Sequence, residues 1–220
     1  MGLVPEKERV KLTEKFAREL TGTVTLVLFT QEFECPHCKE TRQLVEELSE
    51  LSEKINVEVY DFAADEEKVK AFSVDKIPAI AVVGEKDYGI RFYGIPSGYE
   101  FSTLVEDIVD VSNGSTRLSE EVKKKLREIT QPVHIQVFVT LSCPYCPRMV
   151  RLAHQAAVEG PSIRADMVES MEFPHLANKY GVMSVPKTVI NETVEFVGAV
   201  PEEHFLHYVL KASQPSGLVV

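Results

Sequence analysis

The chain carries the same two motifs twice, at one fixed interval. Cys35 and Cys143 each begin a Cys-Pro-x-Cys tetrapeptide, and they lie 108 residues apart. A proline preceded by an apolar residue follows each first cysteine by 43 residues, at Ile77-Pro78 and at Val185-Pro186. Chance rarely repeats two separate motifs at one spacing, so the sequence predicts two copies of one structural unit.

The length of the chain is compatible with this duplication. A chain of 220 residues can form two units of about 110 residues, each large enough to bury its own core. The segment VSNGSTRL, residues 111–118, is polar, contains glycine and separates two helical patterns, which is typical of a linker. We therefore expect an N-terminal unit over residues 1–112 and a C-terminal unit over residues 113–220.

The hydrophobic pattern predicts the same order of elements in both halves. A leading helix is followed by a β-branched strand, the cysteine motif, a helix, a strand, a short helix, the proline turn, a two-stranded hairpin and a last helix. The expected ranges before the proline turn are 6–20, 24–30, 39–54, 56–62 and 66–72 in the first half, and 119–129, 133–140, 148–159, 162–168 and 175–180 in the second. This order is that of a thioredoxin fold. We therefore predict an α/β protein with two tandem thioredoxin-fold units, each a central mixed β-sheet flanked by helices.

Each cysteine motif lies where a predicted strand passes into a helix. The N-terminus of a helix offers unpaired N–H groups and a partial positive charge, and both stabilise a thiolate. This predicts Cys35 and Cys143 as the nucleophiles. Cys38 and Cys146 lie three residues further on, where each can close a ring with the first cysteine and release a bound substrate as a thiol. They are the predicted resolving cysteines.

Other residues of the two motifs are expected to tune the sites. Pro36 and Pro144 suit the first position of a helix, and Pro147 would then fall at the fourth position, where a hydrogen bond is lost and a kink is expected. We expect a protonated His37 to favour the Cys35 thiolate. Tyr145 is expected to form an aromatic rim that shapes the access of substrates.

The net charge limits the partners and divides the two halves. The chain has a net charge of −10, which argues against nucleic acid or an anionic membrane as a partner. Residues 1–112 hold 23 Asp or Glu against 13 Lys or Arg, whereas residues 113–220 hold 11 of each. No apolar run approaches the ~20 residues of a membrane span, and the N-terminal segment lacks the pattern of a signal peptide. We therefore expect a cytoplasmic protein.

The same asymmetry predicts a difference between the two cysteine pairs. The first pair has acidic neighbours, whereas the second pair has basic neighbours and no acidic residue between positions 128 and 159. The acidic neighbours are Glu32, Glu34 and Glu40, and the basic ones are Arg148, Arg151 and Lys187. Because a like charge opposes a thiolate and an opposite charge favours it, we expect Cys143 to be the more acidic thiol and its pair to be the principal reducing site.

Zinc is the main alternative to redox chemistry for such cysteine pairs. The two pairs of a zinc ribbon lie about 15 to 20 residues apart, whereas these pairs are 108 residues apart and each has its own strand, helix and later proline. We therefore predict no metal site. A non-enzymatic scaffold that holds zinc or binds peptides remains open as the alternative outside the enzymes.

The chain resembles the protein disulfide oxidoreductases of hyperthermophiles, which are glutaredoxin-like proteins with two thioredoxin-fold units. The likeness spans about residues 7–212 and is strongest in CPYCPRMVRLAHQAA and DMVESMEFPHLANKYGVMSVPK. CPYC is also the glutaredoxin motif, and CPHC occurs in DsbA-type thiol oxidants. The chain has no Trp and therefore lacks the Trp-Cys-Gly-Pro-Cys motif of thioredoxin. Its Gln and Asn residues number only ten, which also favours a thermophile.

The resemblance implies a thiol-disulfide oxidoreductase that reduces, forms or isomerises protein disulfides through mixed-disulfide intermediates. It also implies that Pro78 and Pro186 are cis-prolines facing the cysteines, so that the backbones of Ile77 and Val185 can pair with an extended substrate chain. We expect no organic cofactor, because the redox-active groups are the disulfides Cys35/Cys38 and Cys143/Cys146.

The partners implied by the resemblance are proteins. The substrates would carry thiols or disulfides, and a thioredoxin reductase-like flavoenzyme would supply the electrons. The alternative within the enzymes is the electron-transfer module of a peroxiredoxin system, although such modules usually keep one working cysteine pair and this chain has two. Whether the protein reduces, forms or isomerises disulfides in the cell depends on the reduction potential of each pair relative to the redox potential of the compartment. The sequence does not determine these potentials.

Overall fold

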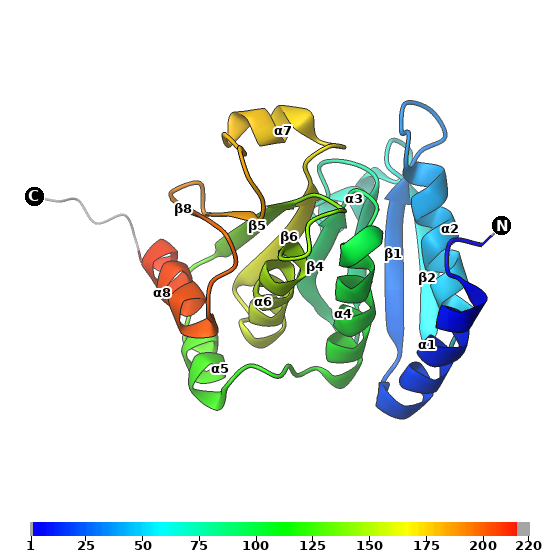
Figure 1. The fold of residues 1–220 in the computed structure, drawn as a ribbon, viewed down its shortest axis with the longest axis horizontal. Coiled ribbons are helices and arrows are strands. Elements are labelled where there is room, and N and C mark those ends of the chain that lie inside the picture. Colours follow the sequence, from blue (N-terminus) through cyan, green and yellow to red (C-terminus); the bar gives the residue numbers. More distant parts are fainter. Residues whose placement is uncertain (1, 215–220) are drawn as a thin grey trace, which may run out of the picture.

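Eight strands form one mixed β-sheet in the computed structural model, which describes residues 2–214. The first half contains α1 (Glu6–Glu19), β1 (Val24–Thr30), α2 (Cys38–Ser49), β2 (Ile55–Asp61), α3 (Glu66–Ala71), β3 (Ala79–Val83), β4 (Asp87–Tyr93), the short 3₁₀ helix η1 (Gly98–Glu100) and α4 (Phe101–Asn113). The second half contains α5 (Glu120–Arg127), β5 (Val133–Val139), α6 (Cys146–Glu159), β6 (Ile163–Glu169), α7 (Pro174–Lys179), β7 (Lys187–Ile190), β8 (Val194–Val197) and α8 (Glu202–Ser213). The strand order is β2-β1-β3-β4-β6-β5-β7-β8, and Figure 1 shows β1 and β2 at one end and β8 at the other.

The predicted fold class is confirmed. Every predicted helix and strand is present, and most bounds agree to within two residues. The segment predicted as a linker is shorter than expected, because α4 continues through Asn113. Gly114 ends this helix with a φ of 59°, a backbone conformation that glycine adopts without steric strain. The connection between the two halves therefore begins at Gly114, whereas the division into units at residue 112 stays a prediction.

The two halves share one sheet because β4 pairs with β6. These strands run parallel, with Ile90 opposite Ala165 and Tyr93 opposite Val168. Each half alone would expose β4 or β6 as an edge strand with unpaired backbone groups. Their pairing covers both edges at the centre of the molecule and fixes the orientation of the two halves relative to each other.

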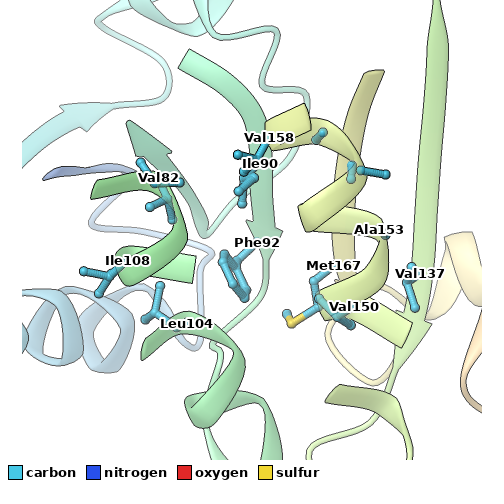
Figure 2. Close-up of a cluster of buried hydrophobic side chains, with 14 of the residues drawn as sticks. Val82, Ile90, Phe92, Leu104, Ile108, Val137, Val150, Ala153, Val158 and Met167 are labelled. Atoms are coloured by element: carbon cyan, nitrogen blue, oxygen red, sulfur yellow. The ribbon is translucent and has the colours of Figure 1, made fainter. Parts of the chain in front are cut away.

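One hydrophobic core also crosses between the halves. On β1, Leu26 and Leu28 face the layer of α1, α2, α4, α5, α6 and α8, whereas Val27 and Phe29 face α3 and α7. This alternation is that of a strand covered on both faces. Figure 2 shows Phe92 of β4 between Leu104 and Ile108 on α4 and Val150 and Ala153 on α6. Within residues 2–214, none of these helices is both long and apolar enough to span a membrane.

A buried ionic network stabilises the opposite face of the same junction. Asp166 of β6 is fully buried, and its carboxylate accepts hydrogen bonds from Arg164 Nε at 3.0 Å and His134 Nε2 at 2.6 Å. Arg164 also donates to Tyr93 Oη at 2.7 Å and to the carbonyl oxygen of Ser73 at 2.8 Å, both in the first half. Burial alone would raise the pKa of Asp166, but His134 and Arg164 outweigh it and hold this pKa at about 2.

Replacing Asp166 by Asn should therefore lower stability in a pH-dependent way. The folded-state pKa lies below the ordinary value of 3.8, so the charge stabilises the fold above about pH 4 and this contribution is lost as the pH falls towards 2. At neutral pH we expect the free energy of unfolding to fall by about 3 kcal/mol, because Arg164 and His134 lose their partner. The loss should shrink steadily in acid.

Urea unfolding followed by circular dichroism at several pH values measures this difference. Glu53→Gln is a suitable control, because Glu53 is exposed and its replacement should leave the free energy of unfolding nearly unchanged. A loss in Asp166→Asn that stays constant down to about pH 2 would show that the charge of Asp166 does not stabilise the fold.

Candidate active site

Both cysteine motifs lie at the same edge of the sheet. β1, β2, β4, β5 and β6 run in one direction, whereas β3 and β7 run in the opposite direction. The segments after β1, β4, β5 and β6 therefore meet at one edge with the turns that precede β3 and β7. These segments contain both cysteine motifs and both apolar-Pro turns, so the fold places the predicted site residues along one edge of the sheet.

The two motifs form disulfides within themselves. Cys35 is bonded to Cys38 and Cys143 to Cys146. The resolving cysteines are the more deeply buried members, since Cys38 is 3% exposed and Cys146 is completely buried. An attacking thiol therefore reaches Cys35 or Cys143 more easily than the second cysteine of either pair. Among residues 2–214, no group of three or more His, Cys, Asp or Glu side chains is arranged to hold a metal ion.

The second pair is surrounded by backbone groups suited to thiol exchange. The backbone N–H of Cys146, the first residue of α6, donates to the sulfur of Cys143 at 3.1 Å. Such a hydrogen bond at a helix N-terminus favours a thiolate on Cys143 after reduction. The carbonyl oxygen of Val185 lies 3.9 Å from the same sulfur. The backbone that precedes Pro186 therefore faces the predicted nucleophile directly.

Both apolar-Pro peptide bonds are cis, as the resemblance implied. They join Ile77 to Pro78 and Val185 to Pro186, and both prolines are buried. Ile77 and Val185 are only half-buried at the turns that lead into β3 and β7. Their pairing with a substrate backbone stays a prediction. The position of the Val185 carbonyl oxygen beside the Cys143 sulfur is the geometric basis for it.

Both helices begin two residues after the proline that was expected at their first position. α2 begins at Cys38 and α6 at Cys146, so Pro36 and Pro144 lie before the helices and not at their first positions. Pro147 falls within the first turn of α6, where its missing N–H has no partner to lose. The predicted kink is therefore wrong, because it rested on a start for this helix that was two residues too early.

His37 and Tyr145 occupy equivalent places, one residue before α2 and α6. Both side chains are exposed, and Tyr145 is 69% exposed. His37 lies close enough to Glu169 and Glu172 at the end of β6 for its charge to lower the pKa of both carboxyls, although burial raises these pKa values overall. That a protonated His37 favours the Cys35 thiolate, and that Tyr145 shapes the access of substrates, both stay predictions.

Two of the three basic residues expected around Cys143 are paired elsewhere. Arg151 forms ion pairs with Asp107 and Asp110 of α4, at the contact between the two halves. Lys187 donates to the carbonyl oxygen of Tyr180 and pairs with Glu195 at 3.0 Å. The charge argument for Cys143 therefore rests on Arg148 and on the backbone N–H at the start of α6. The ranking of the two thiols stays a prediction.

Glu100 is a residue of this edge that the sequence did not single out. It belongs to η1, which packs against the segment before the second motif. The backbone N–H of Tyr99 donates to the carbonyl oxygen of Leu141 at 3.1 Å, and a Cβ on Gly98 would collide with the same oxygen. Glu100 is completely buried, and its carboxyl accepts a hydrogen bond from Thr103 through one oxygen, while the other has no partner among the described residues.

The burial of Glu100 changes its acidity. Removal from water raises the pKa of its carboxyl to about 7. A group with this pKa can accept and return a proton near neutral pH, which thiol exchange requires. In the sequence, nothing distinguishes this glutamate from an ordinary charge at the start of a helix.

Comparisons with known proteins agree with this geometry. A thioredoxin-domain family model matches residues 133–211. The structure of a protein disulfide oxidoreductase from Aeropyrum pernix superposes with a TM-score of 0.90 at 35% identity, over 96% of this chain and 94% of that protein. The structure of an alkylhydroperoxide reductase, AhpF, from Enterococcus faecalis superposes with a TM-score of 0.86 at 28% identity, over 93% of this chain and 98% of that one.

The curated relatives are longer proteins. An NADH dehydrogenase of Bacillus subtilis is 30% identical over 153 residues, which are 70% of this chain but 28% of that protein. An alkyl hydroperoxide reductase of Xanthomonas campestris is 28% identical over the same length. The chain therefore spans little more than a quarter of the curated relatives that it matches.

The order of attack at the second pair can be tested by trapping. In Cys146→Ser, Cys143 can still attack a substrate disulfide but the mixed disulfide cannot be resolved, so it should accumulate. Cys143→Ser should trap little, because Cys146 is completely buried. Both variants should also carry Cys35→Ser and Cys38→Ser, so that the first pair does not resolve the trapped species. Non-reducing electrophoresis and mass spectrometry measure the yield. Equal yields from the two variants would show that the assignment is wrong.

Proposed function

Because the chain belongs to the thioredoxin-fold protein disulfide oxidoreductases, we propose that it exchanges thiols and disulfides with protein substrates. The contact that carries this proposal is the approach of the Val185 carbonyl oxygen to within 3.9 Å of the Cys143 sulfur. A substrate that pairs with this backbone would have its own cysteine sulfur held beside Cys143. The first motif lies at the same edge of the sheet as its own apolar-Pro turn, and we propose it as a second working site.

Reduction of a substrate begins with the dithiol form. The Cys143 thiolate attacks one sulfur of the substrate disulfide, the substrate S–S bond breaks, and its other sulfur leaves and takes a proton. The Cys146 thiolate then attacks the sulfur of Cys143, the mixed disulfide breaks, and the second substrate sulfur leaves as a thiol. Two electrons have passed from the cysteine pair to the substrate. The reverse sequence forms a disulfide in the substrate.

Glu100 is suited to the proton transfers of this cycle. With a pKa of about 7, its carboxyl can take up or release a proton near neutral pH. η1 carries Glu100 from the first half to the loop before the second motif, so the first unit would assist the chemistry of the second. Asp107 on α4 lies close enough to raise the pKa of Glu100 further.

We propose that a flavoenzyme reductase supplies the electrons. Support comes from the alkyl hydroperoxide reductase and NADH dehydrogenase relatives, which this chain matches over 153 residues. Transfer to a peroxidase partner is the second candidate function, because the AhpF structure superposes over 93% of this chain. We propose a cytoplasmic location. Ordinary thiols stay reduced in the cytoplasm, so a cysteine pair there can return from the disulfide to the dithiol form. A thermophilic source is supported only by the few Asn and Gln residues.

Reduction of insulin with dithiothreitol as electron source tests the proposal. The unaltered protein should accelerate the precipitation of the insulin B chain, and a variant with all four cysteines changed to Ser should not. The variant that retains only Cys143 and Cys146 should keep most of the rate, and the one that retains only Cys35 and Cys38 should be slower. Full activity in the protein without cysteines, or stoichiometric zinc with no activity in the reduced protein, would overturn the proposal.

A further inference from the structure

Two large, mostly exposed side chains belong to the two segments that meet at the Cys143 sulfur. Tyr145 stands between the two cysteines of the motif and is 69% exposed. Met183 is 94% exposed and lies two residues before Val185, whose carbonyl oxygen is 3.9 Å from the Cys143 sulfur. One side chain therefore comes from the motif and the other from the proline turn. The fold gains little from either of them, since both are largely in water.

The first pair has polar residues at both equivalent places. The step of 108 residues relates Tyr145 to His37 and Met183 to Asp75, and both of these side chains are exposed. Phe33 is 79% exposed near the first pair, but it lies between Glu32 and Glu34 in the loop after β1 and not in the proline turn. An exposed apolar residue in both the motif and the proline turn is therefore a feature of the second pair.

The position of a bound substrate brings its side chains to these residues. If a substrate strand pairs with the backbone at Val185 and its cysteine sulfur meets Cys143, its neighbouring residues follow at about 3.4 Å each. The side chains one or two positions from the cysteine then lie over Tyr145 and Met183. Methionine adapts to different shapes, and tyrosine offers a large apolar face with little loss of conformational entropy.

We propose that Tyr145 and Met183 form an apolar clamp that selects substrates with a large apolar residue next to the reacting cysteine. The substrate class is unfolded polypeptide, because a cysteine with apolar neighbours is normally buried in a folded protein. The first pair lacks the clamp and does not make this selection. This inference rests on the proposed function and adds to it the substrate class of one site.

The test uses two synthetic peptides that differ only beside the cysteine. Each carries one cysteine in a disulfide with glutathione, flanked by Leu in one peptide and by Ser in the other. The full chain with Cys35→Ser and Cys38→Ser is reduced with dithiothreitol, which is then removed, so the Cys143/Cys146 dithiol supplies the two electrons. Chromatography follows the release of the peptide thiol in a single turnover. We expect the Leu peptide to react about tenfold faster at limiting concentration.

Substituted variants test whether the clamp causes the preference for the Leu peptide. Tyr145→Ser combined with Met183→Ser should bring the ratio of the two rates close to one, and each single change should lower it in part. Met171→Ser is the matched control, because Met171 is 78% exposed at the same edge after β6 but is not part of the clamp. It should keep the full ratio. The chain that retains only Cys35 and Cys38 should show a ratio close to one.

Three outcomes would overturn the inference. These are equal rates for the two peptides in the protein with an intact clamp, an unchanged ratio in the Tyr145→Ser/Met183→Ser variant, and an equal loss of the ratio in Met171→Ser. Failure of the proposed function looks different, since neither peptide would then release its thiol faster than in the protein without cysteines.

Discussion

The parallel pairing of β4 with β6 is the interaction on which the arrangement of the sites depends. It joins the two halves into one sheet and directs β1, β4, β5 and β6 towards the same edge. Both disulfides, both cis-proline turns and η1 are consequently held along that edge. Phe92 between α4 and α6, and Arg164 bonded to Tyr93 and Ser73, secure the junction on the two faces of the sheet. The positions of the sites therefore depend on the core.

The sequence predicted the local structure because repeated motifs and hydrophobic periods are local features. β1 spans the predicted range, both cysteine pairs lie between a strand and a helix, and both proline bonds are cis. The pairing of β4 with β6 has no local pattern, since Ile90 and Ala165 are far apart in the chain. For the same reason the partners of Arg151 and the burial of Glu100 could not be predicted. Their environment comes from contacts between the two halves.

The two sites share a design but differ in their surroundings. Cys143 receives a backbone hydrogen bond, and η1 of the other half is bonded to Leu141 just before the motif. The exposed side chains of Tyr145 and Met183 belong to the motif and to the proline turn. Cys35 is half-buried beside a pocket lined by charged residues that include Lys39, Arg42 and Asp61. Such differences suit sites that meet different partners, for example an unfolded substrate at one pair and an electron-donating protein at the other. The contacts between the halves would then couple the two sites.

The reduction potential of each pair is the most direct test of the claim that both are working redox sites. Two variants, each with one pair intact, can be equilibrated with thiol buffers of known potential and the oxidised fraction determined by mass spectrometry. We expect both pairs to have reduction potentials above about −300 mV and to open and close reversibly, because structural disulfides typically have potentials below this value. A pair that stays oxidised in buffers more reducing than about −300 mV would be a structural bridge, and that pair would then not be a working redox site.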